Sequence, residues 1–275
     1  MEHQPFSVAI SVYRNDIPAY FDRALESITD QQTVKPDEIV LVVDGPVPDE
    51  INAVIDKYSK KYNLKVIRLE TNGGLGNALK IATENCSNEL IARMDSDDVS
   101  SPSRFEEQLS FFGNNPDIDV VGGDISEFIG EESNVVAIRK VPSNNSQIRK
   151  YMKKRCAMNP VSTMFKKSSL ISIGGYQDWY CNEDYFLWIR MWLNDAVFAN
   201  TGSVLVNVRT GTDMYARRGG RQYFQSEKKL QKFMYKHKMI SFPLYFINVA
   251  KRFIVQRLMT NSMRGHFYRK YARKR

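Results

Sequence analysis

Three carboxylates crowd into four positions at the end of a largely apolar run. Asp95, Asp97 and Asp98 follow LIARM at 90–94, a pattern typical of a buried strand. Alternate side chains of an extended chain share a face, so we expect Asp95 and Asp97 to point the same way. Such carboxylates raise each other's pKa unless a cation lies between them. The cluster therefore indicates a site for a divalent cation such as Mg²⁺, which combines one or two carboxylates with substrate phosphates and waters. A solvated turn is the alternative.

A second acidic pair, Glu183 and Asp184, opens the apolar run EDYFLWIRM. Asn182 before it can cap a helix, and acids in the first turn complement the helix dipole. The same carboxylates could instead take a proton from a reacting hydroxyl as a general base. The residues alone leave both interpretations open.

The order of elements around these acids predicts an α/β fold. Strand patterns alternate with helical patterns (strands at 6–13, 37–45, 64–70 and 89–95; helices at 17–31, 49–62 and 74–86). This alternation is typical of βαβ units and of a Rossmann-like, mainly parallel sheet flanked by helices. Later strands at 117–128, 135–141 and 203–211 are expected to continue the same sheet in mixed directions, with helices at 146–156 and 183–195.

Polar residues follow the strands at the edge where such a sheet binds ligands. Tyr13, Asp44, Asn72 and Asp95 all lie at or just beyond the carboxyl ends of predicted strands. In open α/β sheets ligands bind beyond those ends. We therefore expect these four residues to share one site.

Several classes of chemistry are disfavoured by the composition. The three histidines lie near the chain ends, which argues against a Ser-His-Asp triad or a histidine-rich zinc site (His3, His237 and His266). The three cysteines form no spaced set and are expected to be reduced thiols of a cytoplasmic protein (Cys86, Cys156 and Cys181). We expect neither a signal peptide nor a membrane-spanning segment.

Charge divides the chain into two predicted parts. Residues 228–275 contain 14 Lys or Arg and no Asp or Glu, whereas residues 1–227 contain 25 basic and 31 acidic residues. We therefore expect a catalytic domain over 1–227 and a basic helical tail over 228–275. The tail, which mixes apolar and cationic residues, suits a helix lying on an anionic membrane surface. A terminal helix packed on the domain is the alternative. Nucleic-acid binding is not expected, because no reading motif accompanies the charge.

A set of motifs then resembles family 2 glycosyltransferases. SVYRND, VVDGP, NGGLGNAL, ARMDSDD with SRFEEQ, NPVSTMF, GGY and NEDYFLWIRM occur in the family's order over roughly residues 5–225. The resemblance implies the GT-A fold and an inverting transfer from a nucleotide-sugar donor. The chain is most similar to the branch that builds bacterial exopolysaccharide, capsule or O-antigen units.

The resemblance assigns roles in binding the donor. It implies that Asp95 contacts the ribose region, that Asp97 coordinates Mg²⁺ or Mn²⁺ together with Asp95, and that Asp44 reads the base between Val12 and Tyr13. A carboxylate at Asp44 favours uridine, with thymidine and guanosine left open. A simple turn before Gly45 is the alternative.

The glycine-rich turn NGGLGNALK at 72–80 opens a helix, an arrangement that suits a nucleotide. Asn72 is accordingly assigned to donor binding. Many family members carry Arg-Asn where this chain has Leu79 and Lys80, so Lys80 or Arg93 is expected to replace the missing phosphate contact.

For the second acidic pair, the resemblance favours the catalytic interpretation, because it implies that Asp184 is the general base and that Glu183 assists it. We therefore expect a metal-dependent enzyme at the inner face of the membrane that moves a sugar from a UDP-sugar to a lipid-linked or saccharide acceptor. Arg217 and Arg218 could close over the diphosphate. Alternatives are a nucleotidyltransferase, although SVYRNDIPAYF lacks the basic glycine-rich loop it needs, and a nonenzymatic membrane or nucleic-acid adaptor.

Overall fold

Four parallel strands form the first half of the sheet. In the computed structural model, which describes residues 3–211, 219–260 and 263–264, the order is β3-β2-β1-β4. The strands alternate with helices as the sequence predicts (β1 Phe6–Val12, α1 Pro18–Ile28, β2 Glu38–Val43, α2 Asp49–Ser59, β3 Leu64–Arg68, α3 Leu75–Asn85 and β4 Leu90–Met94). Arg217 and Arg218, assigned above to a closing loop, lie outside the described residues.

The second half continues the same sheet in mixed directions, in the order β4-β8-β6-β9-β5 with β7 beside β6. β8 is antiparallel to both β4 and β6, whereas β6 and β9 run parallel. The strands of this half are β5 Val99–Ser100, β6 Val120–Phe128, β7 Val135–Arg139, β8 Met164–Lys166 and β9 Phe198–Arg209. The prediction of one mixed, mainly parallel sheet flanked by helices is confirmed.

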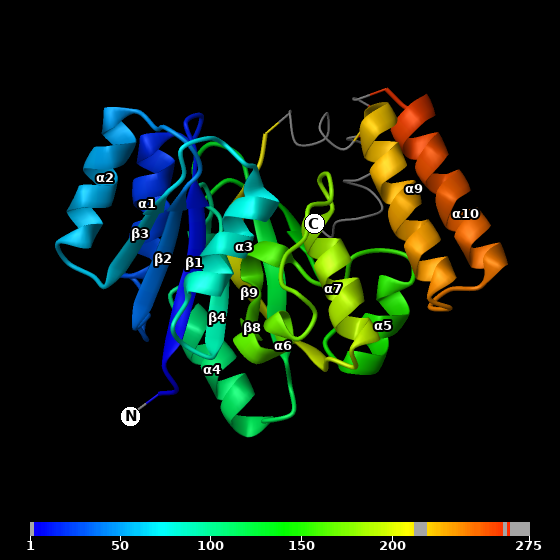
Figure 1. The fold of residues 1–275 in the computed structure, drawn as a ribbon, viewed down its shortest axis with the longest axis horizontal. Helices are drawn as coiled ribbons and strands as arrows, with labels where there is room; N and C mark the ends of the chain where they lie inside the picture. The colour runs from blue at the N-terminus through cyan, green and yellow to red at the C-terminus, as the bar shows by residue number, and fades with distance from the viewer. Residues whose placement is uncertain (1–2, 212–218, 261–262, 265–275) are drawn as a thin grey trace.

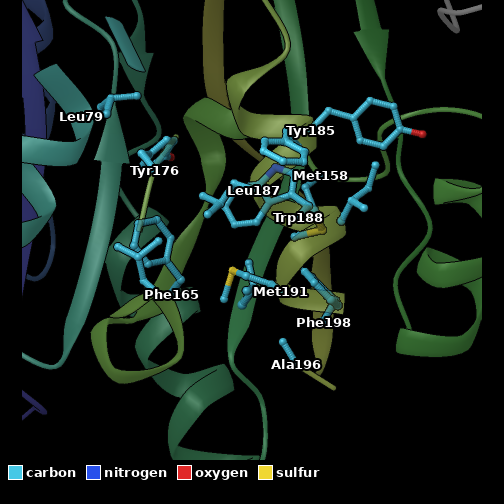
Figure 2. Packing of buried hydrophobic residues seen from close by; sticks show 14 of the residues in the cluster. Leu79, Met158, Phe165, Tyr176, Tyr185, Leu187, Trp188, Met191, Ala196 and Phe198 are labelled. Atoms are coloured by element: carbon cyan, nitrogen blue, oxygen red, sulfur yellow. The ribbon is translucent and has the colours of Figure 1, made fainter. Parts of the chain in front are cut away.

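Helices cover both faces of the sheet and enclose two apolar clusters. One cluster packs α1, α2 and α4 (Arg104–Asn114) on the strands. The other packs α3, α6 (Lys167–Ile171) and α7 (Glu183–Leu193) on the opposite face. Figure 2 shows Trp188 of α7 inside this second cluster, near Phe165 of β8. The apolar surface of α7 therefore fixes the helix whose first turn carries the acidic pair.

The C-terminal part is a helical unit packed on α7. It consists of α9 (Gly220–Lys236), α10 (Phe242–Phe253) and a π-helical turn η2 (Ile254–Leu258), and α9 and α10 run side by side at the end of the molecule opposite α1 and α2 (Figure 1). Leu230 and Met234 of α9 join the core cluster of α7. The predicted boundary between residues 227 and 228 falls inside α9, so the change in charge does not coincide with the end of a helix.

Two remaining helices connect the strands of the second half, α5 (Asn145–Met152) and the 3-10 turn η1 (Pro160–Ser162). Among the residues that the structure describes, none of the helices has the length and apolar character needed to span a membrane.

Candidate active site

The carboxyl ends of β1 and β2 meet at Asp44. The backbone N–H of Asp44 donates to the Val12 carbonyl at 2.8 Å. The buried Asp44 carboxylate accepts the backbone N–H groups of Gly73 and Gly74 at 2.7 and 2.9 Å. Asn72 donates its side-chain amide to the Asp44 carbonyl at 3.1 Å. The structure thus brings Val12, Asp44 and Asn72 together, with Asp44 holding the glycine-rich loop.

Gly45 makes this close approach possible. Its φ is +85°, and a Cβ added there would lie 2.8 Å from the backbone nitrogen of Asn72. A side chain would therefore be strained in conformation and would also push the glycine-rich loop away. The VVDG pattern encodes both the carboxylate and the space that the loop needs.

Tyr13 lies on the other side of the same edge and is 39% exposed. Its backbone N–H donates to Asp16 at 3.0 Å, and the Ser96 hydroxyl donates to the same carboxylate oxygen at 2.9 Å. Burial raises the pKa of Asp16. Asp16 therefore links the loop after β1 to the acidic segment after β4. Sequence reasoning missed this role, although an Asp three residues beyond a strand is a common turn signal.

The acidic segment after β4 places its three carboxylates in different surroundings. Asp95 is partly exposed and Asp97 is exposed, whereas Asp98 is buried and accepts the backbone N–H of Arg209 at 2.8 Å. Arg209 also donates its Nε–H to the Asp97 carbonyl at 3.2 Å. Burial, followed by the charges of Asp97 and Asp95, raises the pKa of Asp98 well above its usual value. Negative charge is therefore crowded at this turn.

The donor atoms at this turn fit a hard divalent cation. The described part of the chain contains no group of three or more His, Cys, Asp or Glu arranged around one metal position. Mg²⁺ and Mn²⁺ need no such group when substrate phosphates and waters complete their shell. Asp97 and Asp95 supply exposed carboxylate oxygens, and a cation would relieve the repulsion recorded at Asp98.

Arg93 is buried behind this turn and lies between two carboxylates. Its guanidinium donates to Asp95 at 2.7 Å and lies 3.8 Å from Asp184. Burial alone would lower the pKa of Arg93, but the charges of Asp95 and Asp184 outweigh it and raise the pKa. The structure thus connects the end of β4 to the start of α7 through one cation. The side chain of Arg93 is only 4% exposed.

The acidic pair lies in the first turn of α7, as the sequence predicts. The hydroxyl of the buried Tyr176 donates to Asp184 at 3.1 Å. Burial raises the pKa of Asp184, against the opposing effect of Arg93. Burial and the charge of Asp184 raise the pKa of Glu183 to about 7. Both carboxylates are therefore stronger bases than ordinary exposed ones. The contact from Tyr176 was not anticipated, although GGY was among the motifs.

Two cavities flank this turn of α7. A cavity of about 880 Å³ lies between the glycine-rich loop and residues 174–181, with Glu183, Tyr176 and Lys80 on its wall. The Lys80 ammonium is 4.0 Å from Glu84 and half-exposed, so it can reach a ligand there. A second cavity of about 740 Å³, which we call the basic pocket, lies between Asp184 and the segment 251–259 of α10 and η2. Both volumes are in the range of small-molecule sites.

The sequence matches the model of a described family over more than half of the chain. The model for glycosyl transferase family 2 matches residues 7–174. UDP-Gal:alpha-D-GlcNAc-diphosphoundecaprenol beta-1,3-galactosyltransferase of Escherichia coli is 39% identical over 269 residues, which cover 98% of this chain and 97% of the relative. The amylovoran biosynthesis glycosyltransferase AmsE of Erwinia amylovora is 37% identical over 245 residues, which cover 88% of this chain and 91% of AmsE.

Solved structures share the fold at lower identity. S. aureus TarS 1–349 in complex with UDP-GlcNAc superposes with a TM-score of 0.64 and 18% identity, covering 94% of this chain and 78% of TarS 1–349. The mannosyltransferase PcManGT from Pyrobaculum calidifontis, solved with GDP-Man and Mn²⁺, gives 0.63 and 13%, covering 98% of this chain and 76% of the other. The nucleotidyltransferase and adaptor alternatives are therefore set aside. The chain belongs to glycosyl transferase family 2 and is a glycosyltransferase with the GT-A fold.

Proposed function

We propose that this enzyme moves a sugar from a UDP-sugar to a hydroxyl of a saccharide carried on a lipid diphosphate, in the synthesis of a bacterial surface polysaccharide. One observation carries the proposal. Arg93 joins Asp95, at the sheet edge where nucleotides bind, to Asp184, beside the basic pocket. The names of the E. coli relative and of AmsE support the pathway, and the TarS complex supports the uridine nucleotide.

The donor would occupy the carboxyl edge of β1, β2 and β4. Tyr13 and Val12 flank the base, and Asp44 accepts its N3–H. Each oxygen of Asp44 already accepts one backbone N–H, but a carboxylate oxygen has a second lone pair for this contact. Asn72 holds the neighbouring loop, and Lys80 in the middle of α3 is placed to meet donor phosphate.

Asp184 would act as the general base in a single displacement. The acceptor oxygen forms a bond to the anomeric carbon while the bond from that carbon to the diphosphate oxygen breaks, and its electron pair leaves with UDP. The hydroxyl proton passes to Asp184. Tyr176 and Arg93 orient this carboxylate, and Glu183, its neighbour in the first turn of α7, would assist it. The β linkage in the E. coli relative's name agrees with inversion of an α-linked nucleotide sugar.

Asp97, with an oxygen of Asp95, would hold Mg²⁺ or Mn²⁺ at the sheet edge. When bound, such an ion neutralises charge that develops on the departing diphosphate. Mn²⁺ in the PcManGT structure supports the proposal. Arg209 contributes by fixing the backbone of Asp97 and the carboxylate of Asp98, so that the Asp97 side chain is left facing outward.

The C-terminal helices would place the enzyme on an anionic membrane surface at the inner face of the cell membrane. α10 exposes Phe242 and Phe246 at 59% and 64%. The residues from 228 onward carry 14 Lys or Arg and no acid. Exposed aromatic side chains beside unopposed cations suit the headgroup region of anionic lipid.

The proposal is tested by assaying transfer directly. We expect the enzyme with Mn²⁺ to release UDP from at least one of UDP-galactose, UDP-glucose and UDP-GlcNAc, and to form a β-linked disaccharide on GlcNAc-α-diphospho-alkyl acceptor. Asp184→Asn should lower kcat by about 10²–10⁴-fold and leave UDP affinity unchanged, because a base contributes roughly that much. Asp56→Asn, an exposed change on α2, is the matched control.

Three results would count against this proposal. An α-linked product would contradict an inverting transfer. Undiminished transfer by Asp184→Asn would contradict the role of Asp184 as the general base. Full activity in the presence of a chelator would contradict the requirement for a metal ion. Absence of transfer to any acceptor, with no UDP binding in calorimetry, would remove the donor assignment as well.

A further inference from the structure

The basic pocket carries an excess of cations. Its wall includes five basic side chains and two acidic ones (Arg139, Lys154, Arg155, Lys251 and Arg252, against Asp184 and Glu227). These cations come from segments far apart in the sequence, near α5 and in α10. A pocket on which separate elements place five cations and two carboxylates suits a ligand with several negative charges.

Three of the five cations, Arg139, Arg155 and Arg252, already have structural partners. Arg252 pairs with Glu227 and donates to the Lys154 carbonyl at 3.0 Å. Arg139 donates to the Cys156 carbonyl at 2.8 Å. Lys154 and Lys251, in contrast, are exposed at the pocket, and none of the described carboxylates pairs with either. Arg252 thus holds the backbone of Lys154 against α10, and the two ammonium groups are available to an anion.

A buried amide marks the neutral part of the same wall. Gln256 in η2 is 4% exposed, and its Oε1 atom is buried without a hydrogen-bond partner among the described residues. An unsatisfied buried acceptor costs free energy that a ligand donor can recover. Sugar hydroxyls are such donors. Asp184 on the same wall would meet another hydroxyl, the one that reacts.

The remaining wall is apolar and continues onto the protein surface. Ile254, Val255 and Met259 line the pocket. Ile254 is also 48% exposed, and Leu258 on the same turn is 64% exposed. An apolar chain leaving the pocket would therefore pass over η2 to the surface on which α10 presents its phenylalanines.

We propose that the basic pocket binds the acceptor through its diphosphate and adjoining sugar, with Lys154 and Lys251 on the diphosphate, Gln256 on a sugar hydroxyl and the lipid leaving over η2. This assignment rests on the proposed function and adds the residues that select a diphosphate-linked lipid. The donor would enter from the other side of α7, where Glu183 and the glycine-rich loop lie. Asp184 then stands between the two substrates.

The test compares three acceptors that carry the same sugar, GlcNAc, and the same alkyl chain. They differ only in the link between the two, which is a diphosphate, a monophosphate or a single oxygen atom. The variants are Lys154→Ala/Lys251→Ala and, as a control of equal charge change, Lys232→Ala/Lys236→Ala on the exposed face of α9. The pocket variant should raise KM for the diphosphate acceptor by roughly a hundred-fold, about ten-fold for each lost charged contact. KM for the UDP-sugar should stay within about two-fold.

The effect should shrink for the monophosphate and vanish for the acceptor without phosphate, and the control should behave as wild type. Gln256→Leu should weaken all three acceptors alike, because it removes a sugar contact. Equal KM in the pocket variant and the wild type, with transfer intact, would overturn the pocket assignment while leaving the proposed function standing. A wild type that binds UDP yet prefers the phosphate-free acceptor would instead overturn the lipid-diphosphate acceptor.

Discussion

The Arg93 side chain connects the two parts of the proposed active site. Its guanidinium donates to Asp95 at 2.7 Å and lies 3.8 Å from Asp184. Its neighbour Arg104, also buried, donates to the Arg93 carbonyl at 2.7 Å and so fixes the end of β4. Burying a cation without partners is costly, so Arg93 is stable here only because two carboxylates accompany it. The same pairing opposes the effect of burial, which raises the pKa of Asp184.

Replacement of Arg93 should therefore change both stability and acid titration. In Arg93→Met two carboxylates lose their partner, and we expect the free energy of unfolding to fall by about 3–5 kcal/mol. Arg93 lowers the pKa of Asp184, so its loss raises that pKa and moves the acid limb of the kcat profile to higher pH. Chemical denaturation and a pH–rate profile measure the two effects.

Arg93→Lys restores the charge without the planar fork and should recover part of the stability and part of the pH shift. If Arg93 touched only the donor phosphate, as the sequence suggested for it, the substitutions would raise KM for the donor and leave the pH profile unchanged. That outcome would contradict the positioning role.

Residue types at this site were easier to predict than their partners. The carboxylates Asp44, Asp95 and Asp184 could be named because strand ends and a helix start are visible in the sequence. The contacts of Asp16 with Ser96, and of Arg209 with Asp97 and Asp98, could not be predicted. They join segments about 80 to 110 residues apart, and only the sheet order brings those segments together.

At the scale of elements, the first turn of α7 carries the proposed general base. Free backbone N–H groups at a helix start favour ionised carboxylates, but burial works against that effect. Burial dominates at Glu183 and Asp184, since both pKa values are raised. The apolar packing of Trp188 and the rest of α7 is the reason that this helix start is buried.

Removal of Glu183 should accordingly shift activity to lower pH. The pair titrates as a unit, and with the pKa of Glu183 at about 7 we expect kcat to fall below neutral pH. In Glu183→Gln the group with a pKa of about 7 is absent, so the acid limb should move down. Glu106→Gln, in the exposed first turn of α4, should leave the profile unchanged.

The same substitution should affect stability with a defined sign. The folded pKa of Glu183 lies above its ordinary value of 4.5, so the folded protein binds this proton more tightly than the unfolded chain. The free energy of unfolding then decreases as pH rises from about 4.5 to 7. Glu183→Gln removes this loss and should be more stable than wild type above neutral pH by about 1–3 kcal/mol. Equal stability at pH 8 would contradict the raised pKa.

Several of the longer elements were predictable, although the longest strand, β9 (Phe198–Arg209), begins five residues before its predicted start at 203. β1, β2 and α3 have enough residues to show a period, and their predicted ranges agree with the structure. β5 has 2 residues and β8 has 3, too few for any pattern. β8 nevertheless joins β4 to β6 and thereby converts two halves into one sheet. Long-range pairing, rather than local propensity, determines such strands.

At the scale of the whole molecule, α9 and α10 form one end, away from α1 and α2 (Figure 1). Phe242, Phe246 and Phe253 share one face of α10 by their spacing, and all are at least 43% exposed. Lys251 lies between Phe246 and Phe253 in sequence, and Arg257 follows in η2. The basic pocket opens beside this surface, since Lys251 and Ile254 line it. A membrane in contact with α10 would therefore deliver a lipid-linked acceptor directly to the pocket.

Phe242→Ser/Phe246→Ser should separate membrane binding from chemistry. Burying a phenylalanine in an apolar phase contributes about 1.5–3 kcal/mol, so loss of two should lower the fraction that floats with phosphatidylglycerol vesicles by at least about ten-fold. Transfer to a short-chain, water-soluble acceptor should be unchanged, whereas transfer to a long-chain acceptor embedded in vesicles should fall in parallel with binding. Ile129→Ser/Val135→Ser, an exposed apolar pair around the β6–β7 turn, is the control.

Because cations add to the attraction, wild-type flotation should weaken with salt and with uncharged phosphatidylcholine vesicles. Undiminished flotation of the phenylalanine variant would show that α10 does not enter the bilayer, and a loss of activity on the water-soluble acceptor would show that these residues support the pocket instead.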